Sequence, residues 1–321
     1  MAAPLIDRLS ARIENRLKMR HYVLLDAIGK YGSVTRVAQQ MSLSQPTVTK
    51  ALADIEDIFM IPLFVRTRRG LEPTPEGEVV LKRARLALVD ATALQQELAA
   101  VQQGRQGRLR VGHIPYLAAN ALDAMWSHLL SLTPRMTLLA HEDTSLNLME
   151  SVRNRELDCA ICRFSQQSIE DEVVQVPLYG QQAYLVVASS SAKRMSDMPL
   201  PEIAELSEME WIFPPSNTPI RHAINAMFAE AGKQVPIPVV ETFSIRAMSS
   251  AMRRLSRGIT VLPGDIARIV ADTGDAQVLS QPLKWILPPV GLAWLRGSPK
   301  AELAEQLAGV ISRAMLRQDC S

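Results

Sequence analysis

Residues 32–59 read GSVTRVAQQMSLSQPTVTKALADIEDIF, and this stretch decides the fold of the N-terminal part of the chain. Ser33 can cap a short helix in which apolar residues recur with the i, i+3, i+4, i+7 spacing of one buried face. After a tight connection, Ser44 can cap a second helix that turns Val48 and Ile55 inward. Two short helices joined in this way predict a helix-turn-helix unit.

The exposed start of the second helix is the candidate DNA-reading surface. The outward residues of its first two turns are Gln45, Pro46, Thr47, Thr49 and Lys50. The positive end of the helix dipole and a Lys side chain suit the phosphate-lined major groove. Gln45 and Lys50 are best able to hydrogen-bond base edges, where Gln favours adenine and Lys favours guanine. Phosphates would repel Asp54, Glu56 and Asp57 further along, so only the first two turns should enter the groove.

A basic hairpin is predicted after the helix-turn-helix. Leu63–Arg66 and Leu71–Pro73 have the pattern of two short strands around a tight turn. Arg66, Arg68 and Arg69 would give the hairpin a basic tip that suits contact with the DNA backbone or the minor groove. The alternative to a DNA-binding helix-turn-helix is an ordinary pair of helices with a solvated surface. The arginine tip argues against that alternative.

Helices are predicted on both sides of this unit. The apolar pattern of Leu17–Ile28 predicts a first helix that Gly29 and Gly32 end. Thr74-Pro75 supplies a cap and a first-turn Pro, and it opens a long helix to about Gln103. An apolar seam runs along that helix and consists of Val80, Ala84, Ala87, Ala91, Leu94, Leu98 and Val101. We expect the seam to pair with a second copy of the chain, and the alternative is packing on its own domain.

Composition and charge limit the class of protein. A chain of 321 residues, 47% of them hydrophobic, predicts two or three domains with cores of their own. The sequence has neither an apolar run of about 18 residues nor an apolar signal segment. Its three cysteines fit a reducing compartment. We therefore expect a cytoplasmic protein away from membranes. Residues 1–110 hold 17 Lys and Arg against 11 Asp and Glu, net +6, whereas residues 111–321 hold 18 against 22, net −4. Only the first part should attract a polyanion.

From Leu109 onward, short apolar strands alternate with helices, which is typical of an α/β domain with mainly parallel sheets. The expected strands are 109–114, 136–140, 158–162, 184–188, 211–213, 239–242, 259–262 and 286–295, and a last helix is expected at 299–316. The predicted fold class is therefore α/β behind a helical N-terminal part.

Catalysis and metal binding find little support in the sequence. Cys159 and Cys162 have the spacing of a zinc or redox pair, but they lie in a strand pattern without a second Cys or His pair. We expect them in the core, with a thiol sensor as the alternative. No motif of a serine hydrolase, a zinc protease, a P-loop or a dinucleotide-binding site occurs. We expect no catalytic residue, no metal site and no cofactor.

Taken together, the N-terminal motifs resemble those of LysR-type transcriptional regulators. They are Gly32–Thr35 with Val37-Ala38, Leu43–Lys50, Ile55-Glu56, Pro62–Arg66 and Thr74–Gly77. The rest is similar in layout, with a linker helix and a two-lobed effector domain like that of periplasmic binding proteins. The resemblance implies a winged helix-turn-helix in 1–74, a linker and dimerisation helix in 75–106 and an effector-binding domain in 107–321. About sixteen residues before the first helix are an addition to the family pattern.

The resemblance also implies how the protein works. It implies that the bases are read by Gln45, Pro46, Thr49 and Lys50. The contacts of the hairpin, or wing, would be made by Arg66 and Arg69, and phosphate would lie within reach of Ser33 and Thr35. It implies a regulator that binds an interrupted palindrome of double-stranded DNA as a homodimer through the linker helix and pairs further into a tetramer, with RNA polymerase as a candidate partner. The alternatives are a winged helix fused to an enzymatic α/β domain and a secreted solute-binding protein.

By the same resemblance, a small-molecule effector binds between the two lobes. The chain should cross between them near Tyr184–Ala188 and Ser280–Ile286, which gives lobe I as 108–183 and 287–321 and lobe II as 188–280. Strand ends and helix N-termini should face the cleft and favour an anionic ligand. The candidate contacts are His113, Pro115, Tyr116, His141, Thr144, Arg163, Phe164, Pro214, Ser216, Asn217, Thr218, Ser244 and Pro263. Trp211–Arg221, together with Glu241–Ser244, resembles family members that sense sugars and aromatic-acid catabolites.

Overall fold

The computed structural model describes residues 5–102, 107–164, 172–190 and 201–316. The chain divides into two compact units, Met1–Ala99 and Ala100–Ser321. The expected end of the linker helix at residue 106 lies outside the described residues.

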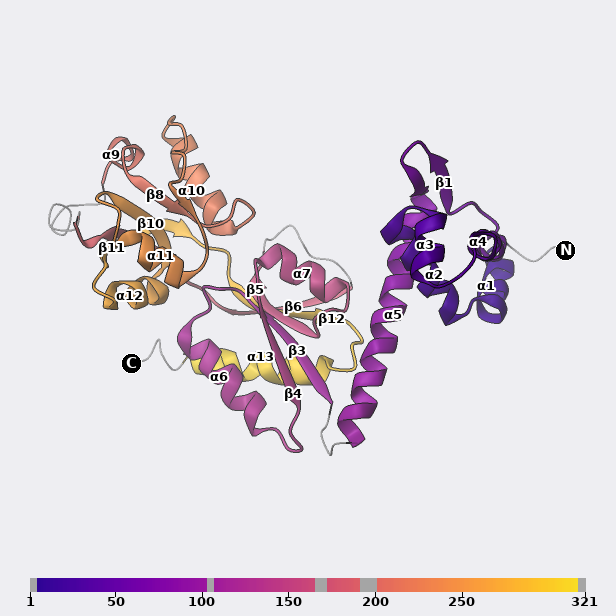
Figure 1. Ribbon diagram of the computed structural model, residues 1–321. Coiled ribbons are helices and arrows are strands. Elements are labelled where there is room, and N and C mark those ends of the chain that lie inside the picture. Colours follow the sequence, from indigo (N-terminus) through magenta and orange to yellow (C-terminus); the bar gives the residue numbers. More distant parts are fainter. Residues whose placement is uncertain (1–4, 103–106, 165–171, 191–200, 317–321) are drawn as a thin grey trace. The chain divides into compact units, whose positions relative to one another are not determined.

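The N-terminal unit is helical with one hairpin (Figure 1). Its elements are α1 (Leu5–Arg16), α2 (Met19–Tyr31), α3 (Val34–Gln40), α4 (Gln45–Phe59), β1 (Phe64–Thr67), β2 (Gly70–Pro73) and α5 (Pro75–Gln102). Both predicted caps form, because the hydroxyl of Ser33 accepts from the backbone N–H of Arg36 and that of Ser44 from Thr47. Val48 and Ile55 are buried as expected in a cluster shared by α2, α3, α4 and the start of α5. The helix-turn-helix and its hairpin are therefore present.

The first predicted helix differs from α2 at both ends. The structure starts α2 at Met19, after a separate helix α1 that the sequence analysis did not predict. Gly32 ends α2 with a left-handed φ of 60°, as expected. Gly29, however, lies inside the helix, so the expectation that it ends the helix was wrong. A Cβ at Gly29 would lie 3.1 Å from the side chain of Leu81, so this glycine allows α5 to approach α2 closely.

The hairpin is fixed to the helices by its backbone. The N–H of Leu71 donates to the carbonyl of Gly32 at 2.8 Å. At the other strand, Oε1 of Glu56 accepts from the N–H groups of Leu63 and Phe64 at 2.8 and 3.1 Å. Gly70 has a φ of 127°, and a Cβ there would lie 2.3 Å from the Gly32 carbonyl oxygen. The basic tip thus has a defined place relative to α3 and α4.

The seam of α5 has two parts with different surroundings. At its start, Ala84 is fully buried in the N-terminal cluster, and Val80 packs against that cluster. Toward its end, Leu94, Leu98 and Val101 are 59%, 58% and 66% exposed. The first part packs on its own unit, whereas the second leaves three large apolar side chains in solvent.

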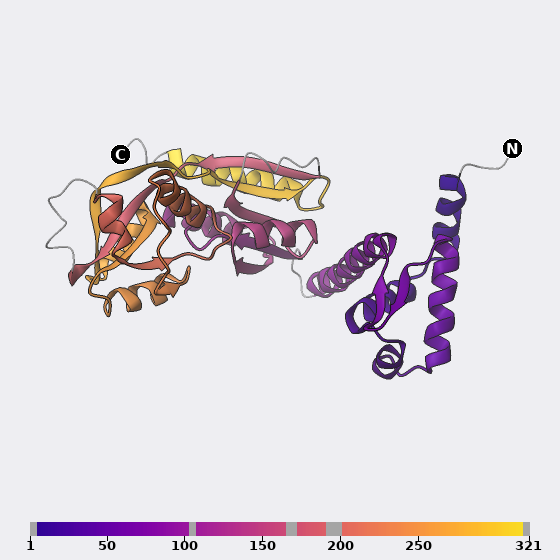
Figure 2. The same cartoon turned by 90° about the horizontal axis from the view of Figure 1, so that it is seen from above.

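The C-terminal unit has two five-stranded sheets, each flanked by helices (Figures 1 and 2). Lobe I has the strand order β4-β3-β5-β12-β6, and lobe II has the order β11-β7-β10-β8-β9. The elements of lobe I are β3 (Arg108–His113), α6 (Ala119–Ser131), β4 (Thr137–Glu142), α7 (Ser145–Arg153), β5 (Cys159–Arg163), β6 (Val173–Tyr179), β12 (Val290–Leu295) and α13 (Ala301–Leu316). Those of lobe II are β7 (Gln182–Ala188), α9 (Ile203–Ser207), β8 (Glu210–Phe213), α10 (Pro219–Glu230), β9 (Val240–Glu241), α11 (Ile245–Met252), β10 (Gly258–Pro263), α12 (Gly264–Asp272) and β11 (Ala276–Ile286).

The chain crosses between the lobes at places that differ from those expected. Tyr184–Ala188 lie within β7 of lobe II, so the first crossing is at residues 180–181, after a strand, β6, that was not predicted. The predicted strand 286–295 is the end of β11 and the whole of β12, and the second crossing lies between them. Pro288 and Pro289 fall there and cannot donate ladder hydrogen bonds, which explains the break.

The sheets are mixed rather than mainly parallel. Among the described strands, β3 pairs parallel with β4 and β5, and β8 with β9 and β10. The crossing strands pair antiparallel, β12 with β5 and β6, and β7 with β10 and β11. The expected parallel pattern holds only for strands joined through helices, because each chain segment that changes lobe enters the new sheet in the opposite direction.

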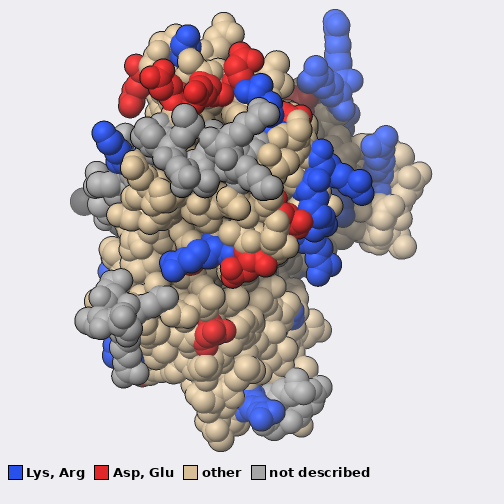
Figure 3. All heavy atoms as spheres, turned by 90° about the vertical axis from the view of Figure 1, so that its left-hand side faces the viewer, with Lys and Arg blue, Asp and Glu red and all other residues tan. Residues whose placement is uncertain are grey.

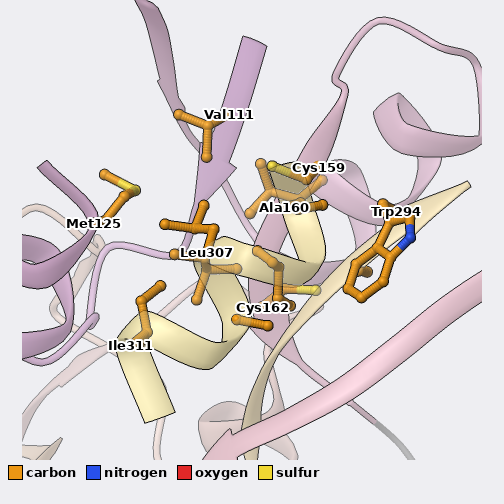
Figure 4. Packing of buried hydrophobic residues seen from close by; sticks show 14 of the residues in the cluster. Val111, Met125, Cys159, Ala160, Cys162, Trp294, Leu307 and Ile311 are labelled. Carbon is orange, nitrogen blue, oxygen red and sulfur yellow. The ribbon is translucent and has the colours of Figure 1, made fainter. Parts of the chain in front are cut away.

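The core of lobe I consists of buried residues of its sheet and of the helices α6, α7 and α13 (Figure 4). Cys159 and Cys162 from β5 belong to this buried cluster, as do Met125, Leu307 and Ile311. Both cysteines are buried and free, as the sequence predicted. A separate cluster forms the core of lobe II and includes Tyr116 from lobe I, which therefore ties the two lobes together.

Candidate functional site

The start of α4 presents the predicted DNA-reading residues to solvent. Gln45, Pro46, Thr47, Thr49 and Lys50 are exposed, whereas Val48 between them is buried. Pro46 lies in the first turn, where a missing N–H costs no helix hydrogen bond. The hydroxyl of Thr47 lies 2.7 Å from that of Ser44 and belongs to the cap. Gln45 and Lys50 are the long polar side chains that this helix end offers to a partner.

The hairpin of the same unit carries exposed positive charge. Arg66, Arg68 and Arg69 on the hairpin are exposed, and no carboxylate of the described chain forms an ion pair with them. At the start of α3, Thr35 is exposed and Ser33 is half-buried by its capping role. The ten predicted DNA contacts therefore lie on α3, on α4 and on the hairpin of one compact unit.

A pocket lies between the lobes of the C-terminal unit, with about 410 Å³ of empty space, part of it open to solvent. Six predicted ligand contacts line it: Pro115, Tyr116, Thr144, Arg163, Pro214 and Thr218. The other lining residues are Ile114, Ser145, Pro219, Ile220 and Phe243. The walls are mainly apolar, with a few polar groups among them. Such a surface suits a small molecule with an apolar body and a polar head.

Arg163 is the charged residue of the pocket and is only 5% exposed. Burial lowers its pKa to about 10, so the guanidinium stays charged at neutral pH. Its Nη1 donates to the carbonyl of Pro288 at 2.8 Å, and its Nη2 donates to Oε1 of Gln181. Gln181 in turn donates to Asp265 of α12 at 2.8 Å. One buried cation thus holds both crossings between the lobes.

Seven predicted contacts lie outside the pocket lining. They are His113, His141, Phe164, Ser216, Asn217, Ser244 and Pro263. His141 is exposed, with Nε2 at 3.7 Å from Oδ2 of Asp143, and Phe164 packs over Gly291 in the core of lobe I. Ser244 caps α11. Asn217 lies close to the pocket, since its Nδ2 donates to Oγ1 of Thr144 across the lobes at 3.4 Å.

Sequence reasoning missed the apolar part of the lining. Ile114, Ser145, Pro219 and Phe243 each adjoin a predicted residue along the chain. The predicted residues therefore reach this pocket, but their apolar neighbours Ile114, Pro219 and Phe243 were not included. A wider selection of one residue on each side of every predicted contact would have included all four.

The surroundings of the two buried cysteines argue against a metal site and against a reactive thiol. Burial raises the pKa of both thiols to about 12. Within the ranges that the structure describes, no group of three His, Cys, Asp or Glu side chains could hold a metal ion. The zinc interpretation of the Cys159–Cys162 spacing therefore has no geometric support.

We expect these thiols to be inert in the native protein. A pKa of about 12 against 9.0 for a free thiol lowers the thiolate fraction at pH 8 about a thousand-fold. With Cys320 replaced by Ser, the thiol reagent DTNB should modify native protein at least about 100-fold more slowly than protein in guanidinium chloride. Equal rates in the two conditions would mean that β5 opens to solvent and would revive the thiol-sensor hypothesis.

The effector unit carries acidic surface, unlike the DNA-reading surface of the N-terminal unit. On the face shown in Figure 3, acidic side chains gather at the end near α9, where Glu205 and Glu208 are exposed. Phosphates would be repelled there. Among the described helices, none is long and apolar enough to span a membrane.

Two family models match the chain in the order that the fold suggests. Residues 19–78 match the bacterial regulatory helix-turn-helix protein, lysR family, and residues 102–316 match the LysR substrate binding domain. HTH-type transcriptional regulator GbpR of Azospirillum brasilense is 26% identical over 287 residues, which cover 89% of this chain and 83% of that protein. The regulator GalR of Pseudomonas putida is 25% identical over 282 residues, which cover 88% of this chain and 70% of that protein.

Solved structures have the same fold. Full-length CbnR in complex with its target DNA aligns with a TM-score of 0.63 at 18% identity, over 93% of this chain and all of that one. A mutant of OxyR from Corynebacterium glutamicum aligns with a TM-score of 0.54 at 21% identity, over 95% of this chain and 93% of that one. These similarities support the winged helix-turn-helix, the long helix and the two-lobed domain in one chain, and they give no support to a fused enzyme. Because the substrate-domain model alone matches more than half of the residues, the chain belongs to the LysR family of DNA-binding transcriptional regulators, which are not enzymes.

Proposed function

We propose that this regulator reads an interrupted palindrome in double-stranded DNA as a dimer joined through α5, and that an aromatic acid bound between its lobes changes this binding. The observation that carries the proposal is the exposed, unneutralised basic surface at the start of α4 and on the hairpin. The assembly would work in the cytoplasm, with RNA polymerase as a candidate partner beside the promoter.

Base reading falls to the first two turns of α4. Gln45 and Lys50 have the length and the donors to reach base edges, and Thr47, Thr49 and Pro46 fit against the groove walls. Arg66, Arg68 and Arg69 contact the backbone or the minor groove beside them. Ser33 and Thr35, at the start of α3, face the phosphates. Phosphate contacts fix the register, and the α4 contacts select the sequence.

Dimerisation is supported by the second half of the seam. Leu94, Leu98 and Val101 leave apolar area in solvent that a partner helix would cover, at about 25 cal/mol per Å² of area removed from water. Ala87 and Ala91 are small enough to let two helices approach. A pair of chains would present two winged helices to two half-sites, and pairing of two dimers would give the tetramer.

An aromatic acid suits the pocket better than a sugar does. Ile114, Ile220 and Phe243 provide apolar walls that would leave sugar hydroxyls without partners. Arg163 uses two of its five N–H donors on Pro288 and Gln181 and has others for a carboxylate. The effector acts only through a difference in affinity between two arrangements of the lobes. We place that difference in lobe closure around the ligand.

Substitutions on α4 and on the hairpin should have different effects. Lys50→Ala should cost about 1–3 kcal/mol of binding free energy and relax the base preference at one operator position. Arg69→Ala should weaken binding to all sequences alike and lower the slope of log affinity against log salt by about one. Gel-shift titrations over a salt series, with operator and random duplexes, separate the two effects.

Lys30→Ala is the matched control, because it removes one exposed lysine of the same unit from α2 instead of α4. It should leave base preference unchanged. Unaltered operator affinity in both the Lys50 and the Arg69 variants would refute the proposed contacts.

The effector class can be tested on the full chain by thermal unfolding. Benzoate and its hydroxylated analogues should raise the melting temperature, since a ligand at 100 times its Kd adds about 2.7 kcal/mol to the stability of the native state. Benzamide, which has the same shape without the charge, should have little effect. An equal shift with benzamide would contradict the role of Arg163, and a shift with sugar acids alone would contradict the aromatic part of the proposal.

A further inference from the structure

The helix α1 lies outside the part of the chain that matches the helix-turn-helix family model, which begins at residue 19. It packs against α4, the helix that carries the DNA-reading residues (Figure 1). Ile58 of α4 is only 2% exposed although it is not part of the hydrophobic cluster of this unit, which is consistent with cover by α1. This chain therefore has an additional element on its recognition helix.

Two arginines of α1 bind one carboxylate of α4. Nη2 of Arg12 lies 2.9 Å from Oδ2 of Asp57, and Nη1 of Arg16 lies 2.8 Å from the same oxygen. The two arginines are four residues apart and so lie on one face of α1. Hydrogen bonding to Arg16 is the main cause of a lowered pKa of Asp57, so the carboxylate is ionised at neutral pH. Two positive charges thus surround one negative charge.

Asp57 is close enough to DNA for its charge to matter. It follows Lys50 by seven residues, and at a rise of 1.5 Å per residue the two lie about 10 Å apart along the helix. The Debye length at 0.1 M salt is also about 10 Å, so screening at this distance is incomplete. Glu56, the neighbouring acid, is already held by the backbone N–H groups of Leu63 and Phe64. Asp57 is the acid of α4 that α1 neutralises.

We propose that Arg12 and Arg16 of α1 are positioning residues for DNA binding, which neutralise Asp57 and so allow the first turns of α4 to approach the phosphates. The inference rests on the proposed role of α4 in reading DNA. A merely stabilising α1 would hold the unit together without any dependence of DNA affinity on the charge of Asp57.

The test is a series of charge-removing substitutions. DNA binding is measured by fluorescence anisotropy on a labelled duplex taken from the DNA that flanks the gene. Arg12→Gln with Arg16→Gln exposes the Asp57 carboxylate, and we expect about five-fold weaker binding at 50 mM salt and a smaller loss at 300 mM. Adding Asp57→Asn to that variant should restore the affinity to within about two-fold of the wild-type value.

Asp26→Asn in the same double variant is the matched control. Asp26 is also an ion-paired acid of this unit, bound to Arg85 at 3.1 Å, and its loss changes the net charge equally. It should not restore binding. Restoration by Asp57→Asn also shows that the triple variant is folded, and circular dichroism of the double arginine variant should match that of the wild type.

Three outcomes overturn the inference. They are wild-type affinity in the Arg12 and Arg16 variant, a loss that Asp57→Asn does not restore, and equal restoration by Asp26→Asn. Lys50→Ala on the same duplex separates this inference from the proposed function. If Lys50→Ala has no effect, the reading surface itself is wrong; if it weakens binding while the arginine variant does not, only the role of α1 fails.

Discussion

Replacing Leu94 and Leu98 by Glu should abolish pairing through α5 and lower operator affinity about 10²- to 10⁴-fold. Both leucines are more than half exposed in a single chain, so the folded unit has little need of them. In a paired seam, four carboxylates would meet in an apolar interface, where burial of charge is costly. The two winged helices would then bind as separate modules and lose the gain in affinity that linkage provides. Sedimentation velocity should show at most half the wild-type mass.

Thr92→Glu with Ala99→Glu is the control for this change. Both residues are exposed on the opposite side of α5, so the helix receives the same charge away from the seam. The control should retain wild-type mass and DNA affinity. A seam variant that retains wild-type mass would refute dimerisation through α5.

Gly70→Ala should destabilise the N-terminal unit by more than about 3 kcal/mol and eliminate DNA binding. The new Cβ would lie 2.3 Å from the carbonyl oxygen of Gly32, at a φ of 127° that side chains rarely adopt. Backbone atoms on both sides cannot rotate away as a side chain could. The hairpin must therefore move, and the bond from Leu71 to Gly32 breaks. Hydrogen exchange read by mass spectrometry can follow this unit separately from the effector unit.

Gly232→Ala separates the clash from the backbone conformation. Gly232 also has a positive φ, 65°, but no atom lies within 4 Å of an added Cβ. Its substitution should cost only about 1 kcal/mol. If the Gly70 variant shows no greater loss than this control, the contact between hairpin and α2 does not carry the stability that we assign to it.

The sequence predicted the N-terminal unit well because its signals are local. Ser33 and Ser44 are caps that act within three residues, and the spacing of Val48 and Ile55 shows which side of α4 is buried. Helix α1 was missed although Leu5, Leu9 and Ile13 recur at helical spacing. Its contact with Asp57 could not be predicted, because that contact joins residues 45 positions apart. No local pattern indicates such a pairing.

In the effector unit, the sequence predicted most of the strands better than the places where the chain changes lobe. A strand looks the same in sequence whether it stays in one sheet or changes lobe, so the crossings were placed wrongly and β6 was missed. The pocket lies at strand ends that the sequence analysis had named, since topology fixes where they meet. Its apolar half was missed because Ile220 and Phe243 have the same pattern as core residues.

Arg163 has a consequence for how this regulator can evolve. The side chain both lines the pocket and joins the two crossings through Pro288 and Gln181. A mutation that removed its charge to accept a neutral ligand would at the same time leave Gln181 and the Pro288 carbonyl without their partner. Selection for new ligands is therefore directed to the apolar wall, where Ile114 or Phe243 can change size at a smaller cost. Descendants of this chain should differ in the shapes they recognise well before they differ in ligand charge.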